Sequence, residues 1–356
     1  MRAPLALPRY AASRRPALVR AAVRGAVAVL AAGAVCAALS ACGSKQDALS
    51  ASEVKPFTVM LDWFPNADHV GIYDAQALGY FRQADLNVHL HAPTNAATPL
   101  QLLESGKVDV AISYTPDVLL ARNQNIPLVS VAAIVQEPLT SIVSVGSQNI
   151  TTAKDLRGKT IGTSGIPYQS AFLETILRHA HVPVSSVRQV DVGEGLVPAM
   201  VSGRVNATLG AYWNYEAVEL AQLHKSPNVI RMNEAGVPSY DELVFVVRRA
   251  TIVNHAPLIR RFVQAVARGY RAARANPVQA TRNLVHMNPG LKYRLQLASV
   301  LVTMPAFFPT GDHPWGWQDP KKWTEFGRWM THNKLISNPN ATPGASTNEL
   351  LAGQGI

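Results

Sequence analysis

Cysteine is nearly absent from this chain of 356 residues, which contains only Cys36 and Cys42. Both lie close to the amino terminus, in a part of the sequence that we expect to be processed. The rest of the chain therefore offers no cysteine for a disulfide, a thiol nucleophile or a cysteine-ligated metal site. The sequence also contains no Gly-x-Ser-x-Gly elbow, no His-Glu-x-x-His and no Walker phosphate-binding loop.

Acidic residues are missing from the first 24 positions, which hold six arginines. Residues 25–41 carry no charge and are rich in Ala and Val, and Leu39-Ser-Ala-Cys42 resembles a bacterial lipobox. This pattern predicts a lipoprotein signal peptide over residues 1–41, acylation of Cys42 and a lipidated polar tether over 42–54. Loss of the six arginines lowers the formal net charge from +10 to +4, so a nucleic-acid partner has little support.

Two alternatives concern export. The uncharged run is close to the length of a membrane-spanning helix, but the small residues before Cys42 and the polar residues after it favour lipoprotein processing. Arg14-Arg15 is a weak indication of twin-arginine export, because Pro16 follows directly. The general and the twin-arginine route both remain open.

Strand and helix patterns alternate along the remaining chain. Apolar runs predict strands at 57–61, 86–91, 108–113, 126–135, 160–163 and 243–247, and helical spacing predicts helices at 256–274, 277–287 and 317–331. Such alternation favours an α/β fold with mostly parallel sheets. The roughly 310 residues that remain are long for one domain, so we expect two lobes.

One internal echo supports two similar lobes. Ser105-Gly-Lys-Val-Asp-Val-Ala-Ile112 recurs as Ser202-Gly-Arg-Val-Asn-Ala-Thr-Leu209. In both, an apolar helix is predicted to end at the glycine, and a strand then runs toward an aromatic residue. Each unit would deliver one strand end to a shared cleft.

The turn after the first predicted strand combines an aromatic ring with polar groups. Pro65 ends the strand, and Asp68 is the predicted N-cap of a helix that runs to about Gly79. Four side chains therefore gather at the carboxyl end of that strand, where open α/β sheets hold ligands: Asp62, Trp63, Asn66 and His69. A tryptophan among hydrogen-bonding groups suits a flat heterocycle. The alternative is a core tryptophan beside an ordinary turn.

Seven segments in order resemble the thiamine-pyrimidine-type solute-binding proteins of ABC importers, a family that also includes the fungal thiamine-pyrimidine synthase. The matching segments cover most of the chain: Leu61-Asp-Trp-Phe-Pro-Asn-Ala-Asp-His69, Gly79-Tyr-Phe81, Ser105-Gly-Lys-Val-Asp109, Gln136-Glu-Pro-Leu139, Asp155-Leu-Arg-Gly-Lys159, Tyr212-Trp-Asn-Tyr-Glu216 and Tyr240-Asp-Glu-Leu243. The resemblance implies a two-lobed periplasmic binding protein fold of type II, with the ligand cleft between the lobes.

The same resemblance implies the division of the chain and its partners. Lobe one would comprise residues 55–142 and 246–356, and lobe two residues 143–245, with hinge crossings near Thr140–Val145 and Leu243–Val247. The protein would be a monomer without a cofactor, anchored by lipid to the outer face of the cytoplasmic membrane. It would pass a small molecule to an ABC permease and its ATPase.

The candidate cleft segments contain acids but no Lys or Arg; they are residues 62–73, 113–118, 136–141, 163–172, 193–198, 210–219 and 234–245. Sulfonate or phosphate ligands usually need an arginine or several helix N-termini, whereas carboxylates beside aromatics suit a ring that bears amino groups. An aminopyrimidine of the thiamine pathway fits best, and riboflavin is the alternative ligand. Besides the four residues of the first turn, the predicted ligand-binding residues are Tyr114, Glu137, Tyr168, Glu194, Tyr212, Trp213 and Glu216.

An enzyme resembling the synthase is the less favoured alternative. The fungal synthase carries a cysteine-rich iron-binding motif, and the corresponding region here, Tyr240–Val247, contains no cysteine. His89 and His91 share one face of a predicted strand and could begin a metal site. Because no third ligand is near in the sequence, we expect a solvated face and no metal there.

Overall fold

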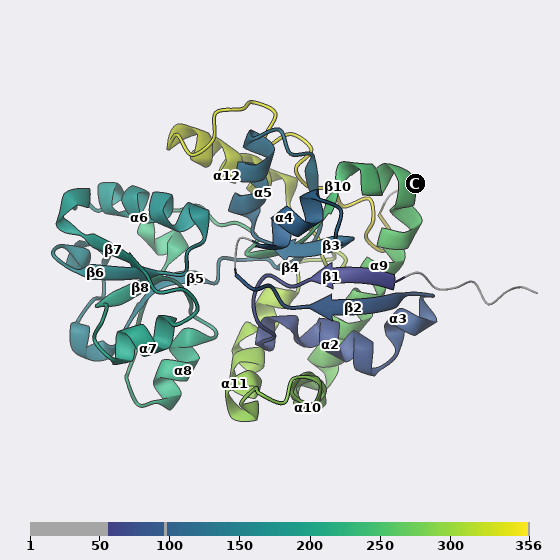
Figure 1. The fold of residues 1–356 in the computed structure, drawn as a ribbon, viewed down its shortest axis with the longest axis horizontal. Helices are drawn as coiled ribbons and strands as arrows, with labels where there is room; N and C mark the ends of the chain where they lie inside the picture. The colour runs from purple at the N-terminus through teal and green to yellow at the C-terminus, as the bar shows by residue number, and fades with distance from the viewer. Residues whose placement is uncertain (1–55, 96–97, 355–356) are drawn as a thin grey trace, which may run out of the picture. The chain divides into compact units, whose positions relative to one another are not determined.

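The computed structural model describes residues 56–95 and 98–354, and Figure 1 shows their fold. The predicted signal peptide, Cys42 and the tether over 42–54 lie outside the described residues. Among the helices that are described, none has both the length and the apolar character needed to cross a membrane.

Two five-stranded sheets form the frame (Figure 1). The first has the order β2 (Asn87–His91), β1 (Pro56–Met60), β3 (Val110–Ser113), β10 (Leu243–Arg248) and β4 (Leu128–Val135). The second has the order β7 (Arg188–Asp191), β6 (Thr160–Thr163), β8 (Ala207–Tyr212), β5 (Thr140–Ser144) and β9 (Asn228–Arg231). β10 and β5 run antiparallel to the strands on both sides of them, and the other four pairings are parallel. The predicted α/β fold is confirmed, and each sheet is mixed because it contains one antiparallel strand.

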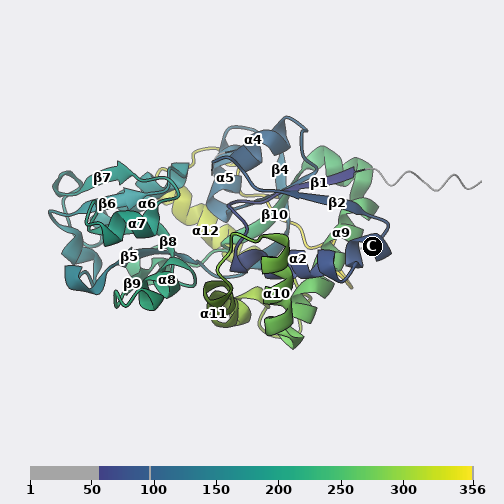
Figure 2. The same cartoon turned by 60° about the horizontal axis from the view of Figure 1, so that its bottom comes forward.

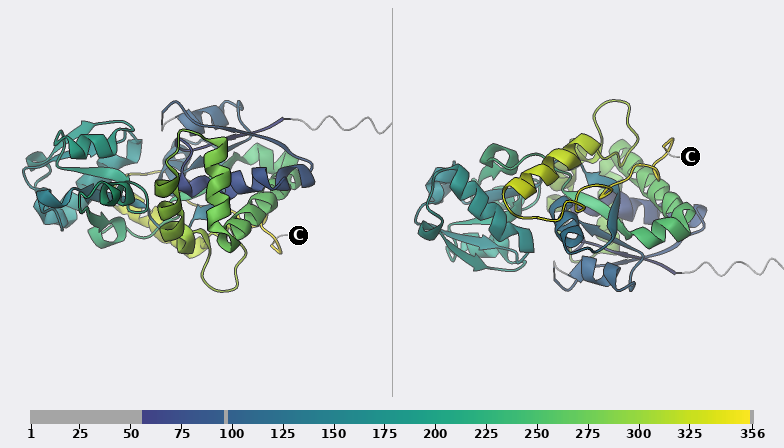
Figure 3. Two further views of the ribbon diagram at one scale, coloured as in Figure 1. Left: turned by 90° about the horizontal axis from the view of Figure 1, so that it is seen from below. Right: turned by 90° about the horizontal axis from the view of Figure 1, so that it is seen from above.

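Helices surround each sheet (Figures 2 and 3). Around the second sheet lie α6 (Pro167–His179), α7 (Leu196–Val201) and α8 (Glu216–Gln222). The first sheet is covered by α2 (Val70–Ala77), α3 (Tyr80–Gln83), α4 (Thr98–Glu104), α5 (Thr115–Asn123), α9 (Arg249–Ala275) and α10 (Pro277–Met287). They are followed by α11 (Tyr293–Thr303) and α12 (Pro320–His332). Because helices cover both faces, the central strands β3 and β10 are buried almost throughout, and so is the edge strand β4.

The sequence echo marks equivalent places in the two sheets. β3 and β8 each occupy the third position in their sheet. Asp109, just before β3, accepts a hydrogen bond from the amide of Thr58 at 2.8 Å. Asn206, just before β8, accepts one from the amide of Thr160 at the same distance of 2.8 Å. Asp109 and Asn206 thus bind equivalent neighbouring strands, β1 in the first sheet and β6 in the second.

The chain passes between the sheets twice, through residues 136–139 and 232–242. The expected lobe boundaries, after residues 142 and 245, fall inside β5 and β10 instead. Which sheet a strand joins depends on the strands with which it pairs, and an apolar run in the sequence does not reveal those partners. Glu242 joins the two crossings, because its carboxylate accepts the amides of Leu139 and Thr140 at 2.7 and 2.8 Å.

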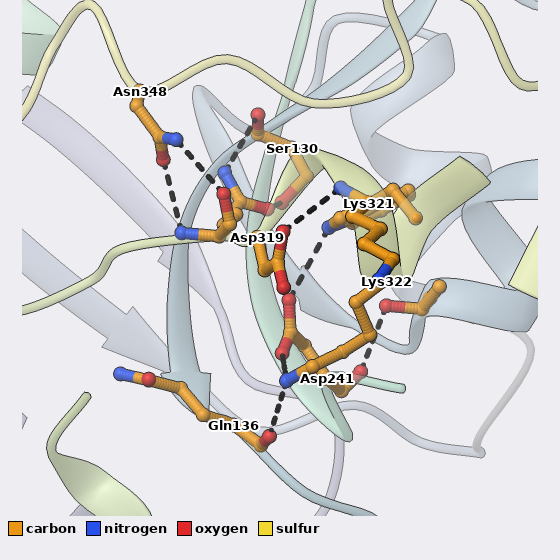
Figure 4. A network of polar contacts seen from close by, with 10 residues as sticks. Ser130, Gln136, Asp241, Asp319, Lys321, Lys322 and Asn348 are labelled. Atoms are coloured by element: carbon orange, nitrogen blue, oxygen red, sulfur yellow. Dashed lines mark hydrogen bonds and ion pairs between the residues drawn. The ribbon is translucent and has the colours of Figure 1, made fainter. Parts of the chain in front are cut away.

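The first turn of α12 forms hydrogen bonds with both crossing segments, 136–139 and 232–242 (Figure 4). The ammonium group of Lys322 donates to the carbonyl of Gln136 at 2.7 Å and to the carboxylate of Asp241 at 2.8 Å. The indole of Trp323 donates to the same carboxylate at 3.2 Å. The helix begins at Pro320 with Asp319 as its N-cap, three residues after the predicted start. One helix terminus therefore contacts both segments on which any hinge motion depends.

Candidate functional site

A small cavity lies where strand ends of the two sheets meet. The lining from the first lobe follows β1 and β3, and the lining from the second lobe lies in β8 or follows β6, β7 and β8. The residues are Asp62, Trp63, Asn66, Tyr114, Ser164, Ile166, Leu196, Gly210, Tyr212, Tyr215 and Glu216. Carboxyl ends of parallel strands are where α/β sheets bind ligands, and the cavity occupies that position in both lobes.

The first-lobe wall is a fully satisfied polar network around Asp62. The imidazole of His69 accepts the amide of Asn66 at Nδ1, at 3.2 Å, so Nε2 carries the proton that it donates to Asp62 at 2.8 Å. The other carboxylate oxygen of Asp62 accepts the hydroxyl of Tyr114 at 3.0 Å. Because both oxygens have partners, the carboxylate is held in one orientation at the cavity.

Asn66, and not the expected Asp68, caps the turn that follows β1. Its side chain accepts the amide of Asp68 at 2.8 Å and begins the short 3-10 helix Ala67–His69, on which α2 continues. His69 closes the capping box from the third position. The sequence suggested the later residue because both Asn and Asp are common N-caps.

Glu216 supplies the second carboxyl group of the cavity. It begins α8, and its Oε2 accepts the amide of Tyr212 at 2.7 Å. Burial raises the pKa of Glu216 to about 7, although the hydrogen bonds from the backbone act in the opposite direction. Near neutral pH this group can therefore accept a hydrogen bond as a carboxylate or donate one as an acid.

Gly210 forms part of the cavity wall where no side chain would fit. Its φ is +117°, and an added Cβ would lie 2.3 Å from the side chain of Gln169. Gln169 in turn accepts the amide of Ser164 at 2.8 Å and donates to the Ser164 hydroxyl at 2.7 Å. The bare backbone of β8 and the loop after β6 are thus held together at the cavity.

A buried hydrogen bond connects the lobes beside the cavity. Asn214, between β8 and α8, donates to the carboxylate of Asp68 at 2.7 Å and to the hydroxyl of Thr303 at 2.7 Å. Burial is the largest cause of the raised pKa of Asp68, and the nearby Asp62 raises it further. The hydrogen bond from Asn214 across the lobes lowers the pKa of Asp68 and so acts in the opposite direction.

Six of the eleven predicted ligand-binding residues line the cavity: Asp62, Trp63, Asn66, Tyr114, Tyr212 and Glu216. The structure gives the other five different surroundings. His69 lies buried behind Asp62, and Tyr168 lies among Tyr114 and Phe172. Glu194 lines an adjoining hollow beside α8, which shares Tyr215 and Glu216 with the cavity.

Trp213 and Glu137 both contact Arg231 and do not line the cavity. The indole of Trp213 donates to the carbonyl of Pro138 at 3.0 Å, and the guanidinium of Arg231 lies 4.1 Å from its ring centre. Arg231 also approaches Glu137 to 4.0 Å. Tyr212 and Trp213 are adjacent at the end of a strand and point to different sides, so only one of this pair reaches the cavity.

Five lining residues were not among the predicted ones: Ser164, Ile166, Leu196, Gly210 and Tyr215. All five lie in segments that the sequence marked as candidate cleft segments. Ile166, Leu196 and Gly210 have apolar or absent side chains, which carry no hydrogen-bonding or stacking indication in the sequence. Ser164 and Tyr215 do have such side chains, but nothing in the sequence distinguishes them from the other polar and aromatic residues of the same segments.

The charge of the cavity is negative or neutral. Its described lining contains the carboxyl groups of Asp62 and Glu216 and no Lys or Arg. Among the described residues there is also no group of three or more His, Cys, Asp or Glu that could hold a metal ion. His89 and His91 are exposed on the edge strand β2. The arrangement can accept hydrogen bonds from amino groups and offers four aromatic rings as apolar surface.

Residues 66–280 match the family described as NMT1/THI5 like. The formylaminopyrimidine-binding protein of Halalkalibacterium halodurans is 35% identical over 290 residues, which cover 79% of this chain and 86% of that protein. The 4-amino-5-hydroxymethyl-2-methylpyrimidine phosphate synthase of Legionella pneumophila is 23% identical over 297 residues, which cover 83% of this chain and 92% of that protein.

Among solved structures, the alkanesulfonate-binding protein SsuA of Xanthomonas axonopodis pv. citri, bound to MOPS, has a TM-score of 0.64 at 13% identity. The match covers 82% of this chain and 98% of that chain. At this identity the likeness shows the fold alone, and it confirms the two-lobed periplasmic binding protein fold. The family match and the 35% identity confirm the resemblance that the sequence indicated. The chain belongs to the NMT1/THI5-like family.

Proposed function

We propose that this chain is an extracytoplasmic solute-binding protein that captures a small amino-bearing heterocycle, a pyrimidine of the thiamine pathway, for an ABC permease. The observation that carries the proposal is the cavity lining, which combines two carboxyl groups with Trp63 and three tyrosines and contains no Lys or Arg among the described residues. A ring amino group donates hydrogen bonds, and carboxylates accept them. The name of the Halalkalibacterium halodurans relative supports the same ligand class.

Charge argues against another ligand class. An alkanesulfonate, the ligand class named for the SsuA structure, would meet Asp62 and Glu216 without a cation to balance its charge.

We further propose binding without turnover. The Legionella pneumophila relative carries a synthase name, so an enzyme is the alternative within the family. This chain has no cysteine beyond residue 42, and the carboxyl groups of its cavity are engaged with backbone and side-chain donors rather than with a nucleophile. Lipid anchoring through Cys42, a monomeric state and the permease partner belong to the same proposal.

Mass spectrometry of small molecules released from the purified protein tests the ligand, and thermal unfolding confirms direct binding. We expect an aminopyrimidine to be released, and added aminopyrimidine to raise the melting temperature with log concentration above its dissociation constant. Riboflavin in the released fraction would redirect the assignment to a flavin carrier. Recovery of a chemically altered pyrimidine after incubation with the protein alone would support the enzyme. Cys42→Ser tests the anchor, and unchanged lipid labelling of that variant contradicts it.

A further inference from the structure

A long stretch around α9 carries positive charge without acids. Residues 243–311 contain ten Lys or Arg and no Asp or Glu, whereas the whole chain contains 33 and 23. Six of the ten are arginines of α9. The imbalance is therefore concentrated on one helix and its neighbours, and the site proposed above makes no use of it.

Four arginines of α9 are exposed and form what we call the arginine face: Arg261, Arg268, Arg271 and Arg274. Their spacing of seven, three and three residues places them on one side of the helix. The pKa of Arg271 is lowered by partial burial and by the charges of Arg268 and Arg274, which shows that the three guanidinium groups lie near one another.

The partners of the arginine face are mostly uncharged. Arg268 lies over the ring of Tyr80 at 3.9 Å, and Arg274 over that of Phe308 at 4.0 Å. Arg268 also donates to the amide oxygen of Gln83 at 2.7 Å. In the ion pairs of the described residues a single carboxylate, that of Asp85, approaches this face, 3.6 Å from Arg261. The face therefore keeps a net positive charge.

The Arg261 end of the arginine face lies beside the place where the domain begins. Phe262, next to Arg261, packs against Phe57 of β1 with ring centres 5.1 Å apart, and Figure 1 shows β1 and α9 together. β1 starts at Pro56. From Cys42 to that strand the chain has about 13 residues, which span at most roughly 45 Å when fully extended. A lipid on Cys42 would thus keep α9 within reach of the membrane.

We propose that the arginine face docks on the anionic phospholipid headgroups of the membrane that carries the anchor, and so orients the domain. This rests on the lipid anchoring in the proposed function. Guanidinium groups bind phosphate through paired hydrogen bonds, and basic residues near an anionic surface each add attraction that salt screens.

The test uses the intact lipidated protein reconstituted into vesicles that contain a headgroup quencher. A fluorophore is attached at Gln264→Cys on α9, or at Ser185→Cys on the second lobe, both exposed positions. We expect quenching at position 264 to be at least about fivefold stronger in phosphatidylglycerol vesicles than in phosphatidylcholine vesicles. About 0.5 M salt should abolish the difference, and position 185 should show none.

Charge reversal supplies the matched control. Arg268→Glu, Arg271→Glu and Arg274→Glu together should remove the quenching, whereas Arg157→Glu, Arg204→Glu and Lys225→Glu on the second lobe should not. Equal quenching in the two lipids, equal quenching at the two labels, or equal loss in both triple variants would overturn the proposal. If the protein does not bind to the vesicles, both labels give the same signal, and this result also overturns the proposal. The melting shift with aminopyrimidine, measured on the same samples, decides the ligand proposal separately.

Discussion

Glu216→Gln is the substitution that most directly probes the cavity. Glutamine keeps the size of the side chain, and its amide oxygen can still accept the Tyr212 amide that Glu216 accepts at 2.7 Å. The unliganded fold should therefore persist. What the variant loses is the charged acceptor for a ring amino group. A hydrogen bond to a charged group contributes about 1.5–3 kcal/mol, so binding should weaken about ten- to a hundredfold.

Glu219→Gln is the matched control, because Glu219 lies on the same helix. Its carboxylate pairs with Lys292 at 3.7 Å and lines the adjoining hollow beside α8, but not the cavity itself. Titration calorimetry with an aminopyrimidine should give a dissociation constant within about twofold of the parent for this control. If Glu216→Gln also stays within about twofold, or if both variants weaken binding equally, the ligand does not contact Glu216.

The pH dependence of binding gives a second reading of the same group. Burial raises the pKa of Glu216 to about 7 in the unliganded protein. Below that pH the carboxyl group of Glu216 is mostly protonated. A ligand that needs the ionised carboxylate can then bind only when Glu216 loses its proton, which weakens the apparent affinity. Affinity should therefore rise from about pH 5.5 to pH 8 and then level off, by on the order of thirtyfold for 1.5 pH units. Dividing the affinity of the parent by that of Glu216→Gln at each pH cancels the titration of the ligand itself. A ratio that does not change with pH contradicts the assignment of Glu216 as the titrating group.

Further predictions concern stacking, backbone, hinge and pH. Trp63→Ala should weaken ligand binding in calorimetry by about 1–3 kcal/mol, with the unliganded melting temperature kept. Gly210→Ala should lower the free energy of unfolding by about 1–3 kcal/mol, because its φ of +117° is unfavourable for a residue with a side chain and the new methyl group would displace the Gln169 amide, whereas Gly290→Ala, in open space, should not. Lys322→Met leaves a buried carboxylate unpaired and should cost about 3–5 kcal/mol in urea unfolding, against at most about 1 for the exposed Lys321→Met. Three buried carboxyl groups have a pKa raised to about 7, so the folded protein binds more protons than the unfolded chain, and the free energy of unfolding should fall from pH 5 to pH 7 and then level off.

Much of the fold could be predicted because its determinants are local. Apolar runs marked the strands, and the echo around Asp109 and Asn206 marked the same hydrogen bond in both lobes. The switch between sheets was placed a few residues late, because pairing partners are not written in a strand's own sequence. The Asn66 cap was missed for a similar reason: it depends on His69 closing the box from the other side.

The site could be predicted in its segments but less well in its side chains. Trp63 and Trp213 look alike in the sequence, since both follow a strand and lie beside polar residues. The structure distinguishes them, because Arg231 covers the ring of Trp213 and the carbonyl of Pro138 accepts a hydrogen bond from its indole N–H. Gly210 matters through the space that Gln169 occupies. Such roles depend on contacts between distant segments, which no single-sequence pattern reports.

The measurement that bears most directly on the proposed function is a calorimetric titration of the purified protein with 4-amino-5-hydroxymethyl-2-methylpyrimidine and, separately, with an alkanesulfonate. A cavity lined by two carboxyl groups and four aromatic rings, without Lys or Arg in its described lining, predicts one saturable site for the pyrimidine and no heat of binding for the sulfonate. Saturable binding of the sulfonate with none of the pyrimidine would contradict the account.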